Sequence, residues 1–198
     1  REFAQTIHQS GQHLLSVVND MLDVAKIEAG HMTLACVQVD IRTLLDELAL
    51  LHTGCAQQKG LVLHTHLADN LPEYMNTDPT RLRQIINNLL SNAVKFTHQG
   101  EVTLSAHWTG NTLVIGVRDT GPGIAPQIQE VVFERFRQAA SFVTREHGGT
   151  GLGLALVREF VKLMGGKLHL SSQLGQGAYF EFSIPEINPA TRVTSPAH

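Results

Sequence analysis

The first 29 residues form one long helical pattern with more apolar surface than a single helix can bury. Nothing between Arg1 and Ala29 breaks a helix except Gly11, and Gly30 stands where a helix ends. Apolar residues recur at alternating spacings of three and four, which is the pattern of a coiled-coil seam. The seam consists of Ile7, Leu14, Val17, Met21 and Val24, and it is widened by Leu15, Val18, Leu22 and Ala25. We therefore expect this helix to pack against a second helix or a second copy of itself, with packing onto the following domain as the alternative.

The start of the chain indicates that the helix has lost a partner. The sequence begins with Arg1 rather than Met, and it begins inside the helical pattern. We expect the chain to be a fragment of a longer protein, with the missing helix upstream of Arg1.

The remaining residues alternate between helical and strand patterns. Asp40 is placed to cap a helix, with Val39 and Leu44 forming a hydrophobic staple around its start. Asp78-Pro79 is a second start signal, an N-cap followed by proline at the first helical position. The periodicities predict helices over residues 41–58, 79–96 and 151–164, and strands over residues 32–39, 61–67, 101–108, 112–119, 167–172 and 178–184. A few helices that cover a sheet with hairpin neighbours indicate an α+β fold, the two-layer α/β sandwich.

One stretch resists this description. Residues 120–150 are rich in glycine, proline and polar residues, and only residues 127–133 have the pattern of a short helix. A connection that long with so little structure is usually a functional lid.

Composition excludes several classes of protein. The 198 residues carry 15 Lys and Arg against 18 Asp and Glu, a net charge of −3, with no basic stripe for nucleic acid. No apolar run reaches the roughly 18–20 residues that a membrane helix needs, so we expect no membrane contact in this part of the protein. Cys36 and Cys55 are too few for a disulfide framework or a zinc site, and the 11 histidines lack metal-ligand spacing. We expect a cytoplasmic location, with a membrane anchor possible elsewhere in the intact protein.

The helix predicted over residues 79–96 carries an unusual polar row. Asn88, Asn92 and Lys95 follow each other at spacings of four and three, so they share one helical face. That face is bordered by apolar residues, and burying an unpaired amide there costs about 1–3 kcal/mol. An exposed polar face explains Asn87 well but explains this row poorly, so the row is a candidate binding surface.

Two glycine-containing segments carry further chemical information. Asp119-Thr-Gly121-Pro-Gly123-Ile124 places a carboxylate at a strand end, beside backbone that a ligand can approach closely, although Asp-x-Gly is also common in turns. Gly148-Gly-Thr-Gly-Leu-Gly153-Leu154 opens a helix, and such an N-terminus has free amides and a favourable dipole for an anion. It is neither a Walker loop nor the dinucleotide fingerprint, so it predicts a phosphate site of another kind.

In this order along one chain, the segments resemble the catalytic, ATP-binding domain of two-component sensor histidine kinases, within the GHKL superfamily that includes gyrase, MutL and the heat-shock chaperone ATPases. The resemblance covers nearly the whole chain and rests on Asn88-x-x-x-Asn92, Asp119-x-Gly-x-Gly, Phe133-x-x-Phe136, the Gly149-Thr-Gly-Leu-Gly run and Gly175-x-Gly177. Residues 12–30 are similar to the second helix of a dimerisation hairpin. The wording Lys-Ile-Glu-Ala-Gly and Asn-Ala-Val-Lys-Phe-Thr looks most like hybrid kinases, which carry receiver domains. The implied fold is a Bergerat-type mixed sheet covered by helices, preceded by one long coiled-coil-like helix.

The resemblance implies ATP and Mg²⁺ as ligands and assigns roles to individual residues. Asp119 would accept a hydrogen bond from the adenine amino group, which selects adenine over guanine. Asn92 would hold Mg²⁺ through its amide oxygen, with Asn88 near the metal and its water. The charge of the triphosphate would be met by Lys95, Arg137 and Arg145. The further ATP-binding residues implied are Phe96, Gly121, Gly123, Ile124, Gly149, Thr150, Gly151, Leu152 and Gly153, while Phe133 and Phe136 would dock the lid.

Two departures from the superfamily bear on the reaction. ATP-hydrolysing members place a general-base Glu where this chain has Asn88, and an amide cannot take a proton from water, so transfer is favoured over hydrolysis. The family's phosphoacceptor is a His followed by an acidic residue and then a Pro, and no histidine here fits, since His8 precedes Gln9 and His13 precedes Leu14. We expect the acceptor upstream of Arg1. Ala178, where Ser or Thr is more usual, is a smaller departure.

These observations predict three parts: residues 1–30 as the second helix of the dimerisation and phosphotransfer hairpin, 31–185 as the catalytic ATP-binding domain, and 186–198 as a linker tail. The chain would bind ATP without phosphorylating itself. The intact protein would form a homodimer and move the γ-phosphoryl of MgATP to a histidine and then to a receiver aspartate. The alternatives are a non-catalytic dimerisation or interaction module with a degenerate nucleotide pocket, and an ATP-hydrolysing machine.

Overall fold

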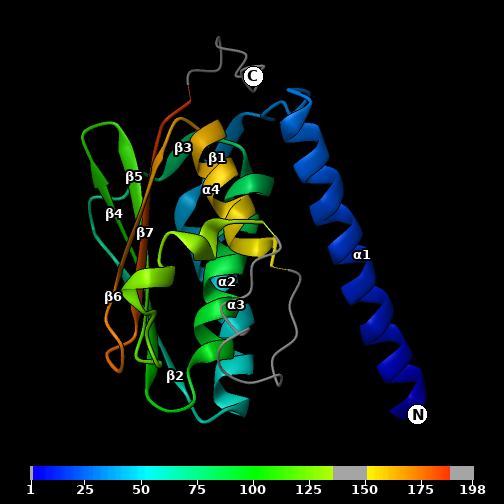
Figure 1. Cartoon of the computed structure of the whole chain (residues 1–198). Coiled ribbons are helices and arrows are strands. Elements are labelled where there is room, and N and C mark those ends of the chain that lie inside the picture. The colour runs from blue at the N-terminus through cyan, green and yellow to red at the C-terminus, as the bar shows by residue number, and fades with distance from the viewer. Residues whose placement is uncertain (1, 136–150, 188–198) are drawn as a thin grey trace.

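Four helices and seven strands make up the fold in the computed structural model, which describes residues 2–135 and 151–187 (Figure 1). Two of the helices begin at the predicted caps. The Asp40 side chain accepts a hydrogen bond from the Thr43 N–H at the start of α2, and Asp78 accepts from the N–H groups of Thr80 and Arg81 at the start of α3. The helices are α1 (Glu2–Glu28), α2 (Ile41–Gln58), α3 (Pro79–Phe96) and α4 (Gly153–Leu163).

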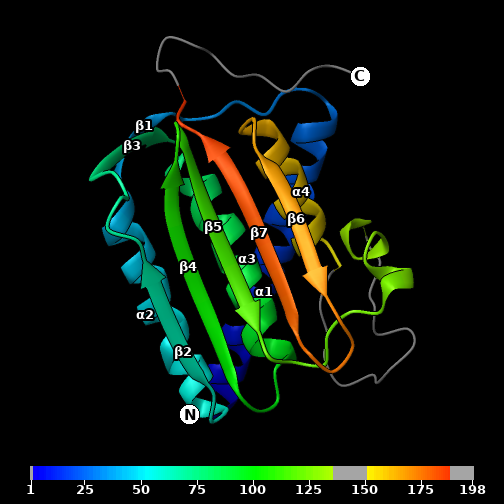
Figure 2. The same ribbon diagram turned by 90° about the vertical axis from the view of Figure 1, so that its left-hand side faces the viewer.

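Five of the strands form one mixed sheet in the order β2-β4-β5-β7-β6 (Figure 2). Strand β2 runs parallel to β4, and the other neighbours are antiparallel. The strands of this sheet are β2 (Val62–Leu67), β4 (Glu101–Thr109), β5 (Thr112–Asp119), β6 (Lys167–Ser172) and β7 (Ala178–Pro185). A separate antiparallel pair joins β1 (Val37–Asp40) to β3 (Tyr74–Thr77).

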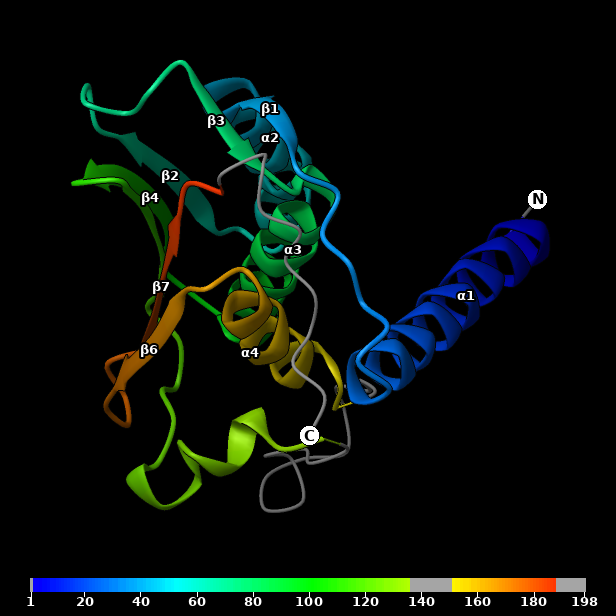
Figure 3. The same ribbon diagram turned by 90° about the horizontal axis from the view of Figure 1, so that it is seen from above.

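Helices α2, α3 and α4 cover one face of the five-stranded sheet (Figures 2 and 3). Alternate residues of β4, β5 and β7 point into this layer, and they form one hydrophobic core with the apolar faces of the helices. Its fully buried members include Leu82, Ile86, Leu90, Leu104, Ile115, Phe160 and Phe182. The predicted two-layer sandwich with a mixed sheet is confirmed.

Several boundaries differ from the predictions, each for a local reason. Residues 32–39 do not form one strand, because the Ala35 N–H is bound by the Asp78 carboxylate at 2.8 Å and only Val37–Asp40 pairs with a neighbour, the unpredicted β3. Helix α4 begins at Gly153 rather than at residue 151, since Gly151 has a left-handed φ of 70°. Instead of one helix over residues 127–133 there are two 3₁₀ turns, η1 (Pro126–Ile128) and η2 (Val131–Phe133).

Helix α1 projects from the sandwich and touches it only near its C-terminal end (Figures 1 and 3). Ile27 is buried there, and Asp23 contacts α3 through Arg81 and Gln84. Packing of the whole helix onto the following domain, the alternative drawn from the sequence, is therefore wrong. The apolar side chains that stay exposed on α1 are Leu14, Leu15, Val18, Met21 and Leu22. Within residues 2–135 and 151–187, no helix combines the length and the apolar character that crossing a membrane requires.

Candidate functional site

The candidate residues of α3 meet the start of α4 at one end of the sandwich. Asn88, Asn92 and Lys95 are partly exposed on α3, whereas the residues beside them, such as Leu89 and Ala93, are buried. A Cβ atom placed on Gly153 would lie 2.9 Å from the Asn88 Oδ1 atom, so the amide of Asn88 reaches the first turn of α4. That turn has no side-chain cap, which leaves its N–H groups to a ligand or to water. The polar row and an anion-binding helix start therefore share one surface.

Asp119 ends β5 as a nearly buried carboxylate, 9% exposed. Its Oδ1 atom accepts hydrogen bonds from the backbone N–H groups of Gly121 at 2.8 Å and of Ala178 at 3.4 Å. Burial raises the pKa of this carboxyl above its ordinary value, and these two hydrogen bonds partly oppose the rise. Within the described residues, no protein group donates to Oδ2, so this oxygen is available to a ligand that carries an N–H group.

Glycines keep the backbone close around this carboxylate. A Cβ atom on Gly121 would lie 2.8 Å from Asp119 Oδ1, 3.2 Å from Thr97 Oγ1 and 3.3 Å from the Phe96 carbonyl oxygen, so this glycine joins the end of α3 to the end of β5. Gly123, with a φ of 71°, packs against the carbonyl of Gln173. The two glycines predicted to admit a ligand therefore also hold the loop against its neighbours.

Ile124 is tied to the sheet through β6. Its N–H donates to Ser172 Oγ at 2.8 Å, and that hydroxyl donates to the Gly177 carbonyl at 2.7 Å. Ile124 is half-buried and packs against the core, as expected for a wall of a binding site. The segment after Asp119 is thus fixed by β6 and by the turn before β7.

We predict that Gly177→Ala will damage both the fold and the site. Gly177 has a φ of 80°, and a Cβ atom there would lie 1.9 Å from the Asp119 carbonyl oxygen, a backbone atom that cannot move without displacing β5. The variant should lose clearly more unfolding free energy in urea than the roughly 1–2 kcal/mol that left-handed strain alone costs.

Gly175→Ala is the matched control for this prediction. Gly175 has a similar φ of 76° but nothing within 4 Å of its Cβ position, so it should show the strain alone. Equal losses in the two variants would contradict the close packing of Gly177 on Asp119.

Lys95 and Phe96 lie at the end of α3. The Lys95 ammonium stands over the Phe96 ring, 5.2 Å from its centroid, and 43% of Phe96 is exposed. Burial lowers the pKa of Lys95, and the charge of Lys59 lowers it further. An ammonium that has given up part of its hydration gains more from an incoming anion than a fully solvated one does.

The remaining candidates divide into described and undescribed positions. Leu152 is fully buried in front of α4, so its side chain serves the core rather than a ligand, and Gly151 supplies the turn. Phe133 packs edge-on against Phe180, 6.2 Å between centroids, as expected for the base of a lid. Arg137, Arg145, Gly149, Thr150 and Phe136 lie outside the described residues.

Sequence reasoning missed three groups that surround Asp119. Thr97 is fully buried, and its hydroxyl donates to the Ala93 carbonyl at 2.7 Å. Ser172 links Ile124 to Gly177, and the backbone N–H of Ala178 reaches the carboxylate. Gly175-x-Gly177 was the only available signal, because the other groups act through backbone atoms or through strand pairing that no local pattern reveals.

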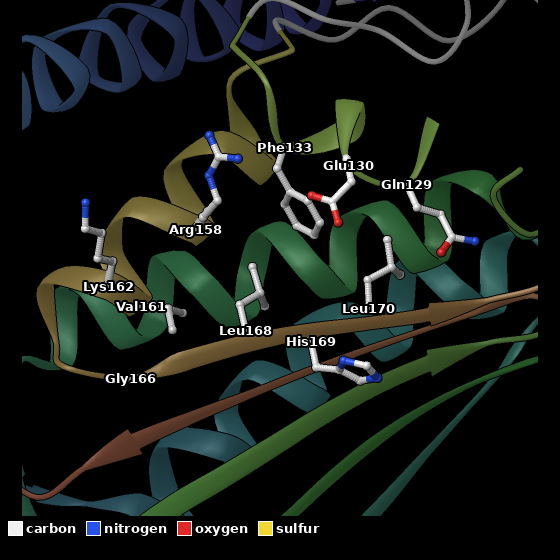
Figure 4. A pocket seen from close by; sticks show the side chains of 10 residues that line it. All are labelled: Gln129, Glu130, Phe133, Arg158, Val161, Lys162, Gly166, Leu168, His169 and Leu170. Atoms are coloured by element: carbon white, nitrogen blue, oxygen red, sulfur yellow. The ribbon is translucent and has the colours of Figure 1, made fainter. Parts of the chain in front are cut away.

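A second pocket, of about 410 Å³, lies between α4, β6 and the 3₁₀ turns (Figure 4). Its lining includes Gln129, Phe133, Arg158, Lys162 and Leu170 and none of the candidate site residues except Phe133. The larger concavity is therefore not where the predicted chemistry gathers. In the described ranges, moreover, no three His, Cys, Asp or Glu side chains are grouped to hold a metal ion.

Comparison with known proteins gives consistent matches. Residues 77–188 match the family described as histidine kinase-, DNA gyrase B-, and HSP90-like ATPase. The signal transduction histidine-protein kinase BarA of Escherichia coli K12 is 38% identical over 203 residues, which cover 100% of this chain and 22% of BarA. The circadian input-output histidine kinase CikA of Synechococcus elongatus is 43% identical over 193 residues, 94% of this chain and 25% of CikA. The chain thus spans about a quarter or less of these relatives.

Solved structures agree with the sequence matches. Full-length ShkA in complex with AMPPNP superposes with a TM-score of 0.82 at 39% identity, covering 96% of this chain and 40% of ShkA. The nucleotide-free catalytic domain of the histidine kinase ThkA has a TM-score of 0.66 at 23% identity, over 77% of this chain and 97% of that domain. The second likeness concerns the fold alone.

Proposed function

The chain belongs to the family of histidine kinase-, DNA gyrase B- and HSP90-like ATPases, in the form found in sensor histidine kinases, and from this premise we propose that it binds MgATP for phosphoryl transfer to a histidine. The phosphoryl group would then pass to the aspartate of a receiver domain. The observation that carries the proposal is the buried Asp119 carboxylate, with one oxygen held by two backbone N–H groups and the other available. ShkA, whose structure holds AMPPNP, supports the choice of ligand.

Adenine recognition is assigned to the end of β5. Asp119 Oδ2 would accept from the exocyclic amino group, which guanine replaces with an acceptor. Phe96 and Ile124 are proposed as walls for the adenine ring, and the backbone at Gly121 and Gly123 lies close enough to follow the base. Because the carboxylate is desolvated, its hydrogen bond to adenine should be stronger than one made in water.

Triphosphate binding is assigned to α3, the first turn of α4 and the lid. Amide oxygens of Asn92 and Asn88 are hard ligands that suit Mg²⁺, and they are partly exposed beside the free N–H groups of α4. The bound metal would neutralise charge on the phosphate oxygens. Lys95, Arg137 and Arg145 are proposed to balance the remaining charge, and Gly149, Thr150, Gly151 and Gly153 to bring backbone N–H groups to the phosphates.

Asn88 decides between transfer and hydrolysis. An amide cannot remove a proton from water, so a bound water next to the γ-phosphoryl group would not be activated by this residue. None of the 11 histidines is followed by an acidic residue, which the family's phosphoacceptor requires. We therefore place the acceptor histidine outside these 198 residues and the homodimer contact on the exposed apolar face of α1. A cytoplasmic location stays a prediction.

We predict that the purified chain will bind an ATP analogue in the presence of Mg²⁺, will hydrolyse ATP slowly, and will take up no stable label from γ-labelled ATP. Calorimetry, phosphate release and autoradiography measure the three properties. Asn88→Ala should leave the slow hydrolysis unchanged within about twofold, because the amide is no general base.

Other outcomes would identify another function. Stable label on the chain would overturn the assignment of the acceptor. Fast turnover that Asn88→Ala abolishes would favour an ATP-hydrolysing machine, and absence of nucleotide affinity would favour the non-catalytic interaction module.

A further inference from the structure

Lys59 lies at the C-terminal cap of α2 and reaches across to the end of α3. Its ammonium donates hydrogen bonds to the Lys95 carbonyl at 2.7 Å and to the Val94 carbonyl at 2.9 Å. One turn earlier, the Ala93 carbonyl accepts from both the N–H and the hydroxyl of Thr97, at 3.1 and 2.7 Å. The last carbonyls of α3, which have no partner within their own helix, are thus bound by one residue of α2 and by the residue that follows α3.

The groups on this last turn are the ones that the site uses. Lys95 and Phe96 belong to it, and the Phe96 carbonyl and Thr97 hydroxyl lie against Gly121, the residue that donates to Asp119. A shift at the end of α3 therefore moves the cation proposed for the phosphates and the aromatic wall relative to the carboxylate. Lys59 itself points to backbone carbonyls, so it would act through α3 rather than by contact with the nucleotide.

The charge of Lys59 matters as well as its hydrogen bonds. The carbonyls at a helix C-terminus carry about half a negative charge, and here they lie on the turn that bears Lys95. A triphosphate that approaches this turn is repelled by those carbonyls unless a cation offsets them. Lys59 supplies that cation without occupying the site.

We propose that Lys59 is a positioning residue for nucleotide binding: by binding the final carbonyls of α3, it fixes Lys95 and Phe96 relative to Asp119 and cancels the negative helix end beside the triphosphate. This inference rests on the proposed function of the same site. It adds a residue from α2, a helix to which the nucleotide site otherwise assigns no role.

The test compares three variants of this chain by calorimetry with a non-hydrolysable ATP analogue and Mg²⁺, well below the thermal midpoint. Lys59→Met keeps the aliphatic stem but removes the charge and the donors, and it should weaken binding by about 5- to 20-fold. Lys59→Arg restores both and should bind within about twofold of wild type. Lys162→Met, which removes an exposed lysine from the last turn of α4, should also stay within about twofold.

A cap that serves stability alone would give a different result. Lys59→Met would then lower the thermal midpoint but leave the affinity of the folded protein within twofold, and this outcome overturns the proposal. Failure of Lys59→Arg to restore binding also overturns it. If wild type itself binds no nucleotide, the proposed function fails first, and the two failures are distinguished by this one titration.

Discussion

Asp119→Asn is expected to lower the affinity for ATP by about 10- to 100-fold without destabilising the free protein. In the native site Oδ1 accepts from the N–H groups of Gly121 and Ala178. Asparagine must keep its oxygen in that position, so its NH₂ group takes the place of Oδ2 and faces the adenine amino group. Two donors then oppose each other where a charged acceptor stood, and a hydrogen bond to a charged group is worth about 1.5–3 kcal/mol.

The stability of the same variant follows from the pKa of Asp119. Burial raises this pKa, so the folded protein holds the proton more tightly than the unfolded chain does. A raised carboxyl pKa stabilises the fold below the unfolded pKa, and the advantage disappears as the pH rises through the folded pKa. At neutral pH the ionised group therefore costs folding free energy, and asparagine should match or exceed wild type in urea.

Nucleotide calorimetry and urea unfolding together test this prediction. The ratio of ATP to GTP affinity should also fall, because the new NH₂ group can donate to the guanine keto oxygen. Unchanged ATP affinity in a folded Asp119→Asn protein would remove Asp119 from the site and favour the non-catalytic module.

Asp23→Ala is expected to release α1 from the catalytic domain. Asp23 is 7% exposed and accepts hydrogen bonds from Arg81 at 2.7 Å and from Gln84 at 3.1 Å. Arg81 also stands over the Phe160 ring, 5.0 Å from its centroid, so the truncation leaves a guanidinium buried without its carboxylate. Losing one partner of a buried ion pair costs about 3–5 kcal/mol. Undocking of α1 relieves that cost, so backbone hydrogen exchange at residues 23–28 should accelerate strongly.

The same helix provides a control for this effect. Arg83 pairs with Glu47 at 2.6 Å, but both side chains are about half exposed, so Glu47→Ala should cost less than about 1 kcal/mol. Replacing the buried pair together, as Asp23→Leu with Arg81→Met, should recover most of the loss because no lone charge remains. Slow exchange at residues 23–28 in Asp23→Ala would show that the ion pair does not hold α1.

The sequence predicted those parts of the fold that local chemistry decides. Asp40 and Asp78 cap their helices as expected, and the turn at Gly110 joins β4 to β5. What it could not predict depends on distant partners. Strand β3 exists because Met75 pairs with Val39 of β1, and Ala35 leaves its expected strand because the carboxylate of Asp78 binds it.

The site was predictable to the same degree. Asn88, Asn92 and Asp119 stand out because a polar side chain on an apolar face or at a strand end needs a reason. Thr97, Lys59 and the Ala178 N–H do not stand out, because the first two contact backbone carbonyls and the last acts through its own amide. Backbone groups are the same at every position, and only folding decides which of them meet.

The antiparallel pairing of β5 with β7 has a consequence for the order in which the molecule assembles. It joins residues far apart in the chain, Val117 with Phe180, whereas β4 and β5 meet through a short turn. Long loops close at an entropic cost before their contacts repay it, so β7 is expected to join late in folding. The surroundings of Asp119 are incomplete until Gly177 and Ala178 arrive. A ligand that binds there cannot speed the early steps, and it prolongs the lifetime of the native state by slowing its unfolding.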